Sequence, residues 1–123
     1  MNNAEAHQFI KQYFKRLFVD RDLTALDEYL HPNYWDDDIG ESSRDHIQNS
    51  KEYLADLFHR IPTIGVEVHD TMAVDHVITS YLEWFRQEHG QKVTVMRGVG
   101  IFVMEGSQIL KRHNYLYDKK EPF

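Results

Sequence analysis

The spacing of apolar residues changes period near Thr63, and this change restricts the possible folds more than any other feature of the sequence. Before Thr63, apolar side chains recur at the spacing of one helix face. After it, runs of β-branched and aromatic residues alternate with turn signals, as in consecutive strands. Helices followed by strands predict an α+β domain, with the helices packed on one face of an antiparallel sheet.

Three segments have the helical period. They are residues 5–20, 20–34 and 41–62. The second offers Asp22 or Thr24 as an N-cap, and the third offers Ser42 or Ser43. We therefore expect three N-terminal helices, of which the first is amphipathic.

Four later segments have strand composition. They are residues 65–75, 76–90, 91–106 and 107–118. The polar and glycine-containing stretches at 88–91 and 105–107 predict hairpin turns between them. The final residues, 119–123, are interpreted as a polar tail of a single domain that spans 1–123.

Composition excludes several classes of function. The chain has 123 residues and a formal net charge of -6, without a basic stripe, so nucleic acid is not an expected partner. It has no cysteine, which excludes disulfides, thiolate nucleophiles and zinc-thiolate sites. No apolar stretch is long enough for a signal or a membrane span, so we expect a cytoplasmic protein without a membrane partner.

Three stretches of sequence resemble a known family. They are RDLTALDEYLHPNYWDD at 21–37, GVEVHDTMAVDHVITSYLEW at 65–84 and RGVGIFVMEGSQILKRHNYLYD at 97–118. Their turns and apolar positions resemble the nuclear transport factor 2-like superfamily, in its SnoaL-like branch. The resemblance implies a cystatin-like cone, in which three helices pack in the concave face of a strongly curved, mixed but mostly antiparallel sheet. It also implies a pocket inside the cone and frequently a homodimer through the outer face.

The resemblance also implies which side chains of the first short strand, NYWDD, face the pocket. Tyr34 and Asp36 then point inward, whereas Trp35 and Asp37 point away. Desolvation of a carboxylate in an apolar cone makes it a stronger base, so Asp36 is the candidate general base and Tyr34 a substrate contact. The alternative is that the aspartates are solvated, or that Asp38 precedes the positive end of a helix.

Strand 76–90 carries large apolar groups on both faces. The alignment implied by the resemblance turns Tyr81 and Glu83 toward the pocket, where Glu83 would be a second carboxylate acting as the acid. The opposite face then holds Ile78, Leu82 and Trp84, which we interpret as a homodimer interface. The alternatives are a solvated Glu83 at the sheet rim, and coverage of the apolar face by the chain's own loops.

The last strand can be read in two registers. Counting from Ile109 puts Arg112 and Asn114 inside, whereas counting back from Asp118 puts His113 and Tyr115 inside. We favour Asn114 and Arg112 as ligand contacts because the leucines of that face then also reach the core. His113 stays a catalytic candidate, because imidazole is a common acid or base in enzymes.

The remaining candidates concern other reactions of the family. Tyr13 and Phe14 are candidate ligand contacts, and Phe14 occupies the position of the enolate-binding tyrosine of ketosteroid isomerases. The acid-arginine-acid set of epoxide hydrolases reads here as Glu83, Tyr81 and Asn114, so neither reaction is expected in its familiar form.

Four further residues are interpreted as turn residues and not as metal ligands: His69, Asp70, Asp75 and His76. Three histidines are placed on helix surfaces: His7, His46 and His59.

These observations lead to one main hypothesis and two alternatives. The main hypothesis is cofactor-free acid/base catalysis, of isomerase, cyclase, hydrolase or dehydratase type, on a small hydrophobic molecule, without a metal. The first alternative is a non-catalytic module that binds a hydrophobic ligand in the same cone. The second is a structural dimerisation module, which predicts a collapsed cone without a cavity.

Overall fold

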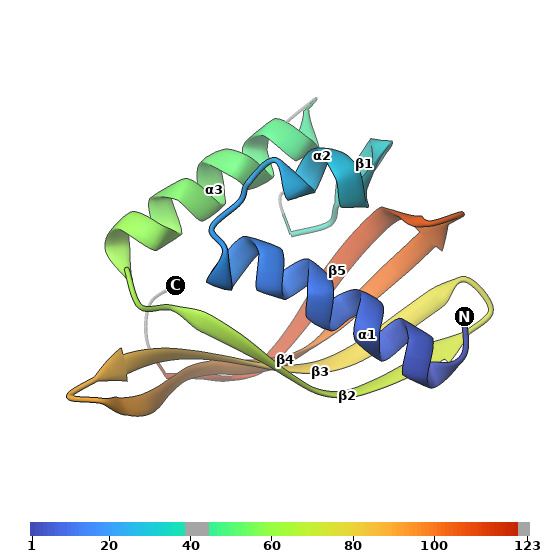
Figure 1. Cartoon of the computed structure of the whole chain (residues 1–123). Coiled ribbons are helices and arrows are strands. Elements are labelled where there is room, and N and C mark those ends of the chain that lie inside the picture. The colour runs from blue at the N-terminus through green and yellow to red at the C-terminus, as the bar shows by residue number, and fades with distance from the viewer. Residues whose placement is uncertain (39–44, 121–123) are drawn as a thin grey trace.

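The computed structural model describes residues 1–38 and 45–120, in which helices precede most of the sheet as expected (Figure 1). The helical elements are α1 (Asn3–Phe14), the π-helical turn η1 (Lys15–Val19), α2 (Ala25–Tyr29) and α3 (His46–Arg60). None of the described helices combines the length and the apolar character that a membrane crossing requires.

The helix ends follow from local capping. Asn2 and Glu5 form a capping box at the start of α1, because each side chain accepts a hydrogen bond from the backbone N–H of the other. At α3 the cap is Asp45, which accepts from the backbone N–H of Gln48. The expected caps Ser42 and Ser43 lie outside the described residues.

One five-stranded sheet forms the rest of the domain. Its strands are β1 (Leu30–Asp36), β2 (Gly65–Val74), β3 (Val77–Glu88), β4 (Gln91–Glu105) and β5 (Gln108–Lys119). The spatial order is β1-β5-β4-β3-β2, with β1 parallel to β5 and all other neighbours antiparallel. The mixed, mostly antiparallel sheet is therefore confirmed. Lys119, which the sequence assigned to the tail, is the last residue of β5.

The sheet curves around the helices, and α1 lies along its concave face (Figure 1). Register shifts interrupt β3, β4 and β5, as expected of a bent sheet. At Gly98 a side chain would not fit, because an added Cβ would lie 2.7 Å from the backbone oxygen of Tyr115. Gly98 therefore allows β4 and β5 to approach each other at the bend.

The predicted orientation of β3 was wrong. Ile78, Leu82 and Trp84 are buried in the core, at 2%, 0% and 3% exposure, and cannot form a dimer interface. Tyr81 and Glu83 lie on the opposite, outer face, where Tyr81 is 36% exposed. The physical reason is that purely apolar side chains gain most from burial, whereas Tyr and Glu can cover apolar surface and keep their polar ends in water.

Candidate functional site

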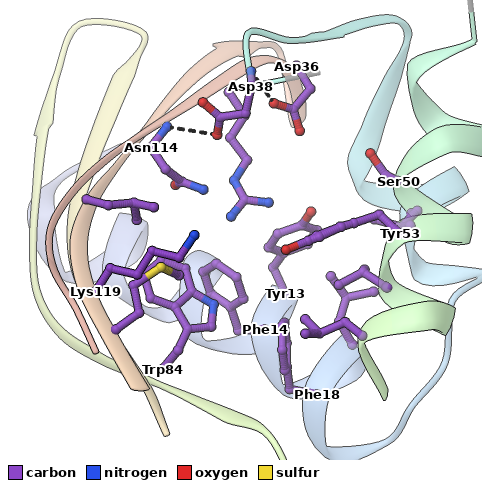
Figure 2. A pocket seen from close by; sticks show the side chains of 17 residues that line it. Tyr13, Phe14, Phe18, Asp36, Asp38, Ser50, Tyr53, Trp84, Asn114 and Lys119 are labelled. Carbon is purple, nitrogen blue, oxygen red and sulfur yellow. Dashed lines mark hydrogen bonds between the residues drawn. The ribbon is translucent and has the colours of Figure 1, made fainter. Parts of the chain in front are cut away.

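A cavity of about 430 Å³ lies between the helices and the concave face of the sheet (Figure 2). Its polar lining comes from β1 and the turn after it, from β5, α1 and α3, and its apolar lining from all three helices, η1 and the sheet. The polar residues are Tyr13, Asp36, Asp38, Ser50, Tyr53, Arg112, Asn114 and Lys119. The apolar residues are Phe14, Leu17, Phe18, Leu26, Leu54, Leu57, Trp84, Met96 and Leu116. The hollow cone argues against the collapsed cone of a purely structural module.

The end of β1 is fixed by hydrogen bonds around Asp36. One carboxylate oxygen accepts from the backbone N–H of Asp38 at 2.9 Å, and the other accepts from the hydroxyl of Tyr34 at 3.3 Å. The backbone N–H of Asp36 donates to Nδ1 of His46 at 2.9 Å. Asp36 is 8% exposed, so its carboxylate keeps one orientation in the wall of the cavity.

His46 was misplaced by the sequence. It was expected on a helix surface, but it is 3% exposed and its ring stacks on Trp35 with centroids 4.2 Å apart. The reason is its position at the first residue of α3, which packs against the end of β1. The helical period of the sequence does not reveal this contact, because the contact joins two different elements, β1 and α3.

Asp38 was expected to be solvated, and its side chain is indeed 40% exposed, but its place in the cavity wall was missed. It lines the cavity, and one of its oxygens accepts from the backbone N–H of Asn114 at 3.3 Å. Burial, reinforced by the neighbouring charge of Asp36, raises the pKa of Asp38, against the opposing effects of Arg112 and His113. The available signal was its spacing, since a residue two positions beyond Asp36 returns to the same side of an extended chain.

Arg112 brings a positive charge to the same cavity. Burial alone would lower its pKa, but Tyr13, Tyr34, Asp36 and Asp38 outweigh burial, so the pKa of Arg112 is raised and it stays charged. Burial also raises the pKa of Tyr13 to about 12. The hydroxyl of Tyr13 is therefore protonated near neutral pH and can donate a hydrogen bond.

Of the two registers of β5, the structure has Arg112 and Asn114 on the cavity side. His113 lies on the outer side of the sheet, where its ring packs edge-on against Tyr115 with centroids 4.3 Å apart. Its Nδ1 atom is 3.4 Å from a carboxylate oxygen of Asp38. His113 therefore borders the cavity through Asp38 and does not line it.

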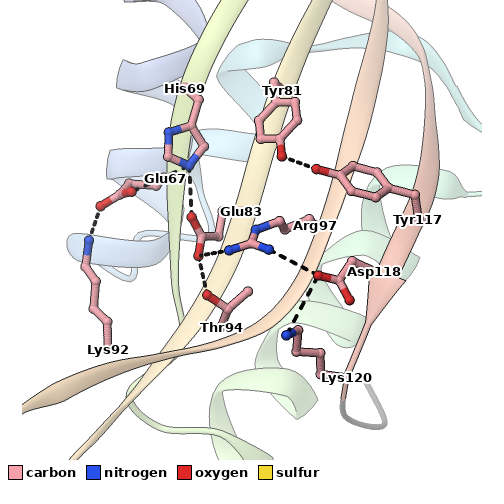
Figure 3. A network of polar contacts seen from close by, with 10 residues as sticks. All are labelled: Glu67, His69, Tyr81, Glu83, Lys92, Thr94, Arg97, Tyr117, Asp118 and Lys120. Carbon is pink, nitrogen blue, oxygen red and sulfur yellow. Dashed lines mark hydrogen bonds and ion pairs between the residues drawn. The ribbon is translucent and has the colours of Figure 1, made fainter.

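The outer face of the sheet holds a separate polar network (Figure 3). Glu83 accepts a hydrogen bond from Thr94, lies 2.9 Å from Nε2 of His69 and 3.7 Å from Arg97. The hydrogen bond from Thr94, with the contacts to His69 and Arg97, holds the pKa of Glu83 below its usual range. The prediction that Glu83 is a protonated acid inside the pocket was therefore wrong. Tyr81, also expected inside, pairs with the hydroxyl of Tyr117.

Potential cation ligands also gather on this outer face. Glu67, His69 and Glu83 offer ligand atoms that all lie within 4.8 Å of one another. Lys92 already pairs with Glu67, while Arg97 and Thr94 contact Glu83. These contacts neutralise both carboxylates, so the cluster is accounted for as an ion-pair network.

The cavity has the groups needed for acid/base chemistry. A carboxylate with a raised pKa, such as that of Asp38, is a stronger proton acceptor than a solvated carboxylate. A guanidinium and a protonated phenol, such as Arg112 and Tyr13, can stabilise an oxygen on which negative charge develops. The apolar walls exclude water and strengthen both effects.

Comparison with protein-family models matches residues 10–112 to the SnoaL-like domain. A comparison with curated protein sequences finds no match.

Several solved structures share the fold. A putative polyketide cyclase from Acidithiobacillus ferrooxidans has 15% identity and a TM-score of 0.72, over 90% of this chain and 87% of that one. TsrD from Streptomyces laurentii has 13% identity and a TM-score of 0.76, over 94% and 90%. An LEH-like epoxide hydrolase of M. tuberculosis has 16% identity and a TM-score of 0.63, over 94% and 84%. At these identities the likeness extends to the fold alone.

Proposed function

Because this chain belongs to the SnoaL-like domain family, we propose that it is an enzyme that performs acid/base catalysis on a small hydrophobic molecule in the cavity. The observation that carries the proposal is the composition of the cavity wall. A guanidinium, two carboxylates and a buried phenol gather in an otherwise largely apolar space of about 430 Å³. Small-molecule sites are typically apolar clefts of this size with a few convergent polar groups.

We assign the proton transfer to Asp38 first. Its raised pKa makes it a stronger base than a solvated aspartate, and its side chain is less enclosed than that of Asp36. Asp36, the base expected from the sequence, then has a second role. Its negative charge helps to raise the pKa of Asp38, and its carboxylate fixes the backbone N–H of Asp38.

The substrate oxygen is assigned to Arg112 and Tyr13. Both line the cavity, and both are donors that can hold an oxygen more tightly as it becomes negative. Asn114 is placed to assist through its side chain, and Phe14 and Trp84 supply apolar contact. His113 is a positioning residue for Asp38 in this scheme.

The test is a turnover screen with matched variants. Small cyclic ketones, enones and epoxides are incubated with the protein, and isomerised, cyclised, hydrated or dehydrated products are detected by mass spectrometry and NMR. We expect Asp38→Asn to reduce turnover by about 100-fold or more. Asp36→Asn should reduce it less and move the pH optimum to lower pH, because the pKa of Asp38 falls when the charge of Asp36 is removed.

Two outcomes would contradict this assignment. Full turnover by Asp38→Asn would remove its role as the base. Tight binding without turnover of any tested class, unaffected by either aspartate variant, would instead favour the non-catalytic binding module. Glu83→Gln is the matched control, because it changes a carboxylate on the outer face of the sheet.

We also propose a homodimer and a cytoplasmic location. The proposed dimer interface moves from the buried face of β3 to the outer face of the sheet. The outer sheet face exposes three tyrosines, Tyr81, Tyr115 and Tyr117, at 36%, 60% and 58%. Aromatic side chains of this kind are common at protein interfaces. Sedimentation of the wild type and of Tyr115→Asp checks this, and a monomeric wild type at micromolar concentration would refute the dimer.

A further inference from the structure

The guanidinium of Arg112 lacks acceptors. Within residues 1–38 and 45–120 it makes no ion pair and no hydrogen bond, and its Nε atom is buried without a partner. Its neighbours are instead the ring faces of Phe14 and Phe102, at 5.8 and 5.7 Å. None of its five N–H groups therefore has a hydrogen-bond acceptor among the described residues.

The two nearby carboxylates already have other donors. Asp36 accepts from the hydroxyl of Tyr34 and from the backbone N–H of Asp38. Asp38 accepts from the backbone N–H of Asn114. These carboxylates keep Arg112 charged through space, but they do not occupy its N–H groups. A buried charged group without hydrogen-bond acceptors costs free energy. We therefore expect a ligand in the cavity to supply the acceptor.

The form of the guanidinium indicates which acceptor fits. Its planar fork matches the two oxygens of a carboxylate, which it can bind through two parallel hydrogen bonds. Lys119 also lines the cavity (Figure 2), and in the described part of the chain it has no ion pair. Arg112 and Lys119 thus balance the charges of Asp36 and Asp38. Every negative charge on a ligand adds to this balanced set, so a monoanion is repelled less than a phosphate dianion.

We propose that the cavity binds a compact hydrophobic carboxylic acid, with the carboxylate on Arg112 and the apolar body against Phe14, Leu57 and Trp84. This inference rests on the proposed function only in taking the cavity as a small-molecule site. With a carboxylate on Arg112, Tyr13 is left as the donor to the reacting oxygen. It adds the substrate class, an organic monoanion, which neither the fold nor the acid/base assignment specifies.

The test compares four probes that share one apolar body: naphthoate, its primary amide, its methyl ester and naphthyl phosphate. Binding to the full chain is measured by calorimetry and by NMR chemical shifts. We expect naphthoate to bind about 10-fold or more tightly than the amide and the ester, as for a charge-assisted pair. Arg112→Gln should remove this preference, whereas Arg112→Lys should keep part of it.

The control is Arg97→Gln, which removes an arginine from the outer face and should keep the preference for naphthoate. Circular dichroism establishes that each variant is folded. Equal binding of acid and amide, a preference for the phosphate, no binding of naphthoate at millimolar concentration, or an unchanged preference in folded Arg112→Gln would each overturn the proposal.

These outcomes are separable from those of the turnover screen. Turnover confined to neutral compounds, lost in Asp38→Asn, would support acid/base catalysis and contradict the carboxylate ligand. A preference for naphthoate that depends on Arg112, together with full turnover by Asp38→Asn, would support the ligand class and contradict the catalytic assignment.

Discussion

Polar groups on the two faces of the curved sheet differ in whether they have partners within the protein. On the outer face, Glu83 and Arg97 have partners close by: Thr94 donates to Glu83, and Arg97 lies 3.2 Å from Asp118 (Figure 3). On the inner face, Arg112 has a charge but no acceptor among the described residues. The carboxylates differ in the same way, because the pKa of Glu83 is lowered and that of Asp38 is raised.

The difference separates polar groups that stabilise the fold from polar groups that await a ligand. Glu83, Arg97 and Asp118 on the outer face pair with one another, so their charges need no further explanation. Groups in the cavity are held in place at an energetic cost, which is typical of sites whose partners arrive from solution. Paired substitutions, one on each face of the sheet, test whether the two faces differ in this way.

The largest contrast concerns burial on β3. Trp84→Ala should lower the free energy of unfolding by about 3 to 5 kcal/mol, because it opens a hole in the core. Tyr81→Ala, three residues earlier on the outer face, should change the free energy by less than about 1 kcal/mol. Urea denaturation of both variants measures these values, and the reverse order would contradict the orientation of the strand.

The next contrast concerns the two perturbed carboxylates. On a substrate found by the screen, Asp38→Asn should lose about 100-fold or more in kcat. Glu83→Gln should keep kcat near that of the wild type, because its carboxylate pairs with Thr94 and His69 away from the cavity. Equal losses in both variants would show that the outer network is part of the active site.

A smaller contrast lies between two buried tyrosines: Tyr13 lines the cavity, whereas Tyr34, expected as a substrate contact, is not among the lining residues. Tyr34→Phe removes a hydrogen bond to Asp36 and should lower the free energy of unfolding by about 1 kcal/mol. Tyr13→Phe removes a hydroxyl that has no partner in the described structure, so it should cost less than about 0.5 kcal/mol. It should instead weaken ligand binding. A large stability loss in Tyr13→Phe would mean that its hydroxyl has a structural role.

The smallest effects are those of pH on stability, and they have opposite signs on the two faces. The folded-state pKa of Asp38 is raised, so its ionisation opposes folding once the pH exceeds the unfolded value of about 4. Asp38→Asn should therefore be more stable than the wild type at neutral pH, and this advantage should vanish in acid.

Glu83 should behave in the opposite way. Its folded-state pKa is lowered, so its stabilising contribution is present above the unfolded value and is lost as the pH falls through the folded one. Glu83→Gln should therefore be less stable than the wild type at neutral pH. Thermal melts of both variants between acid and neutral pH measure these differences, and changes of the same sign would contradict the comparison.

The sequence predicted the fold further than it predicted the site. The change of period near Thr63 was enough for three helices followed by a sheet, because periodicity reports burial directly. The period did not show which face of β3 is buried, because both faces carry large apolar side chains, such as Leu82 on one and Tyr81 on the other. The cavity carboxylate Asp38 was missed because its position depends on a hydrogen bond from Asn114 on β5, which is distant in sequence.

The most direct test of the account is the NMR signal of the Arg112 Nε–H during titration with naphthoate, compared with that of Arg97 in the same spectra. The account predicts that the Arg112 signal shifts and saturates with the ligand, while the Arg97 signal stays in place. An unchanged Arg112 signal at saturation, or an equal shift of Arg97, would contradict the claim that the cavity keeps its cation for a ligand.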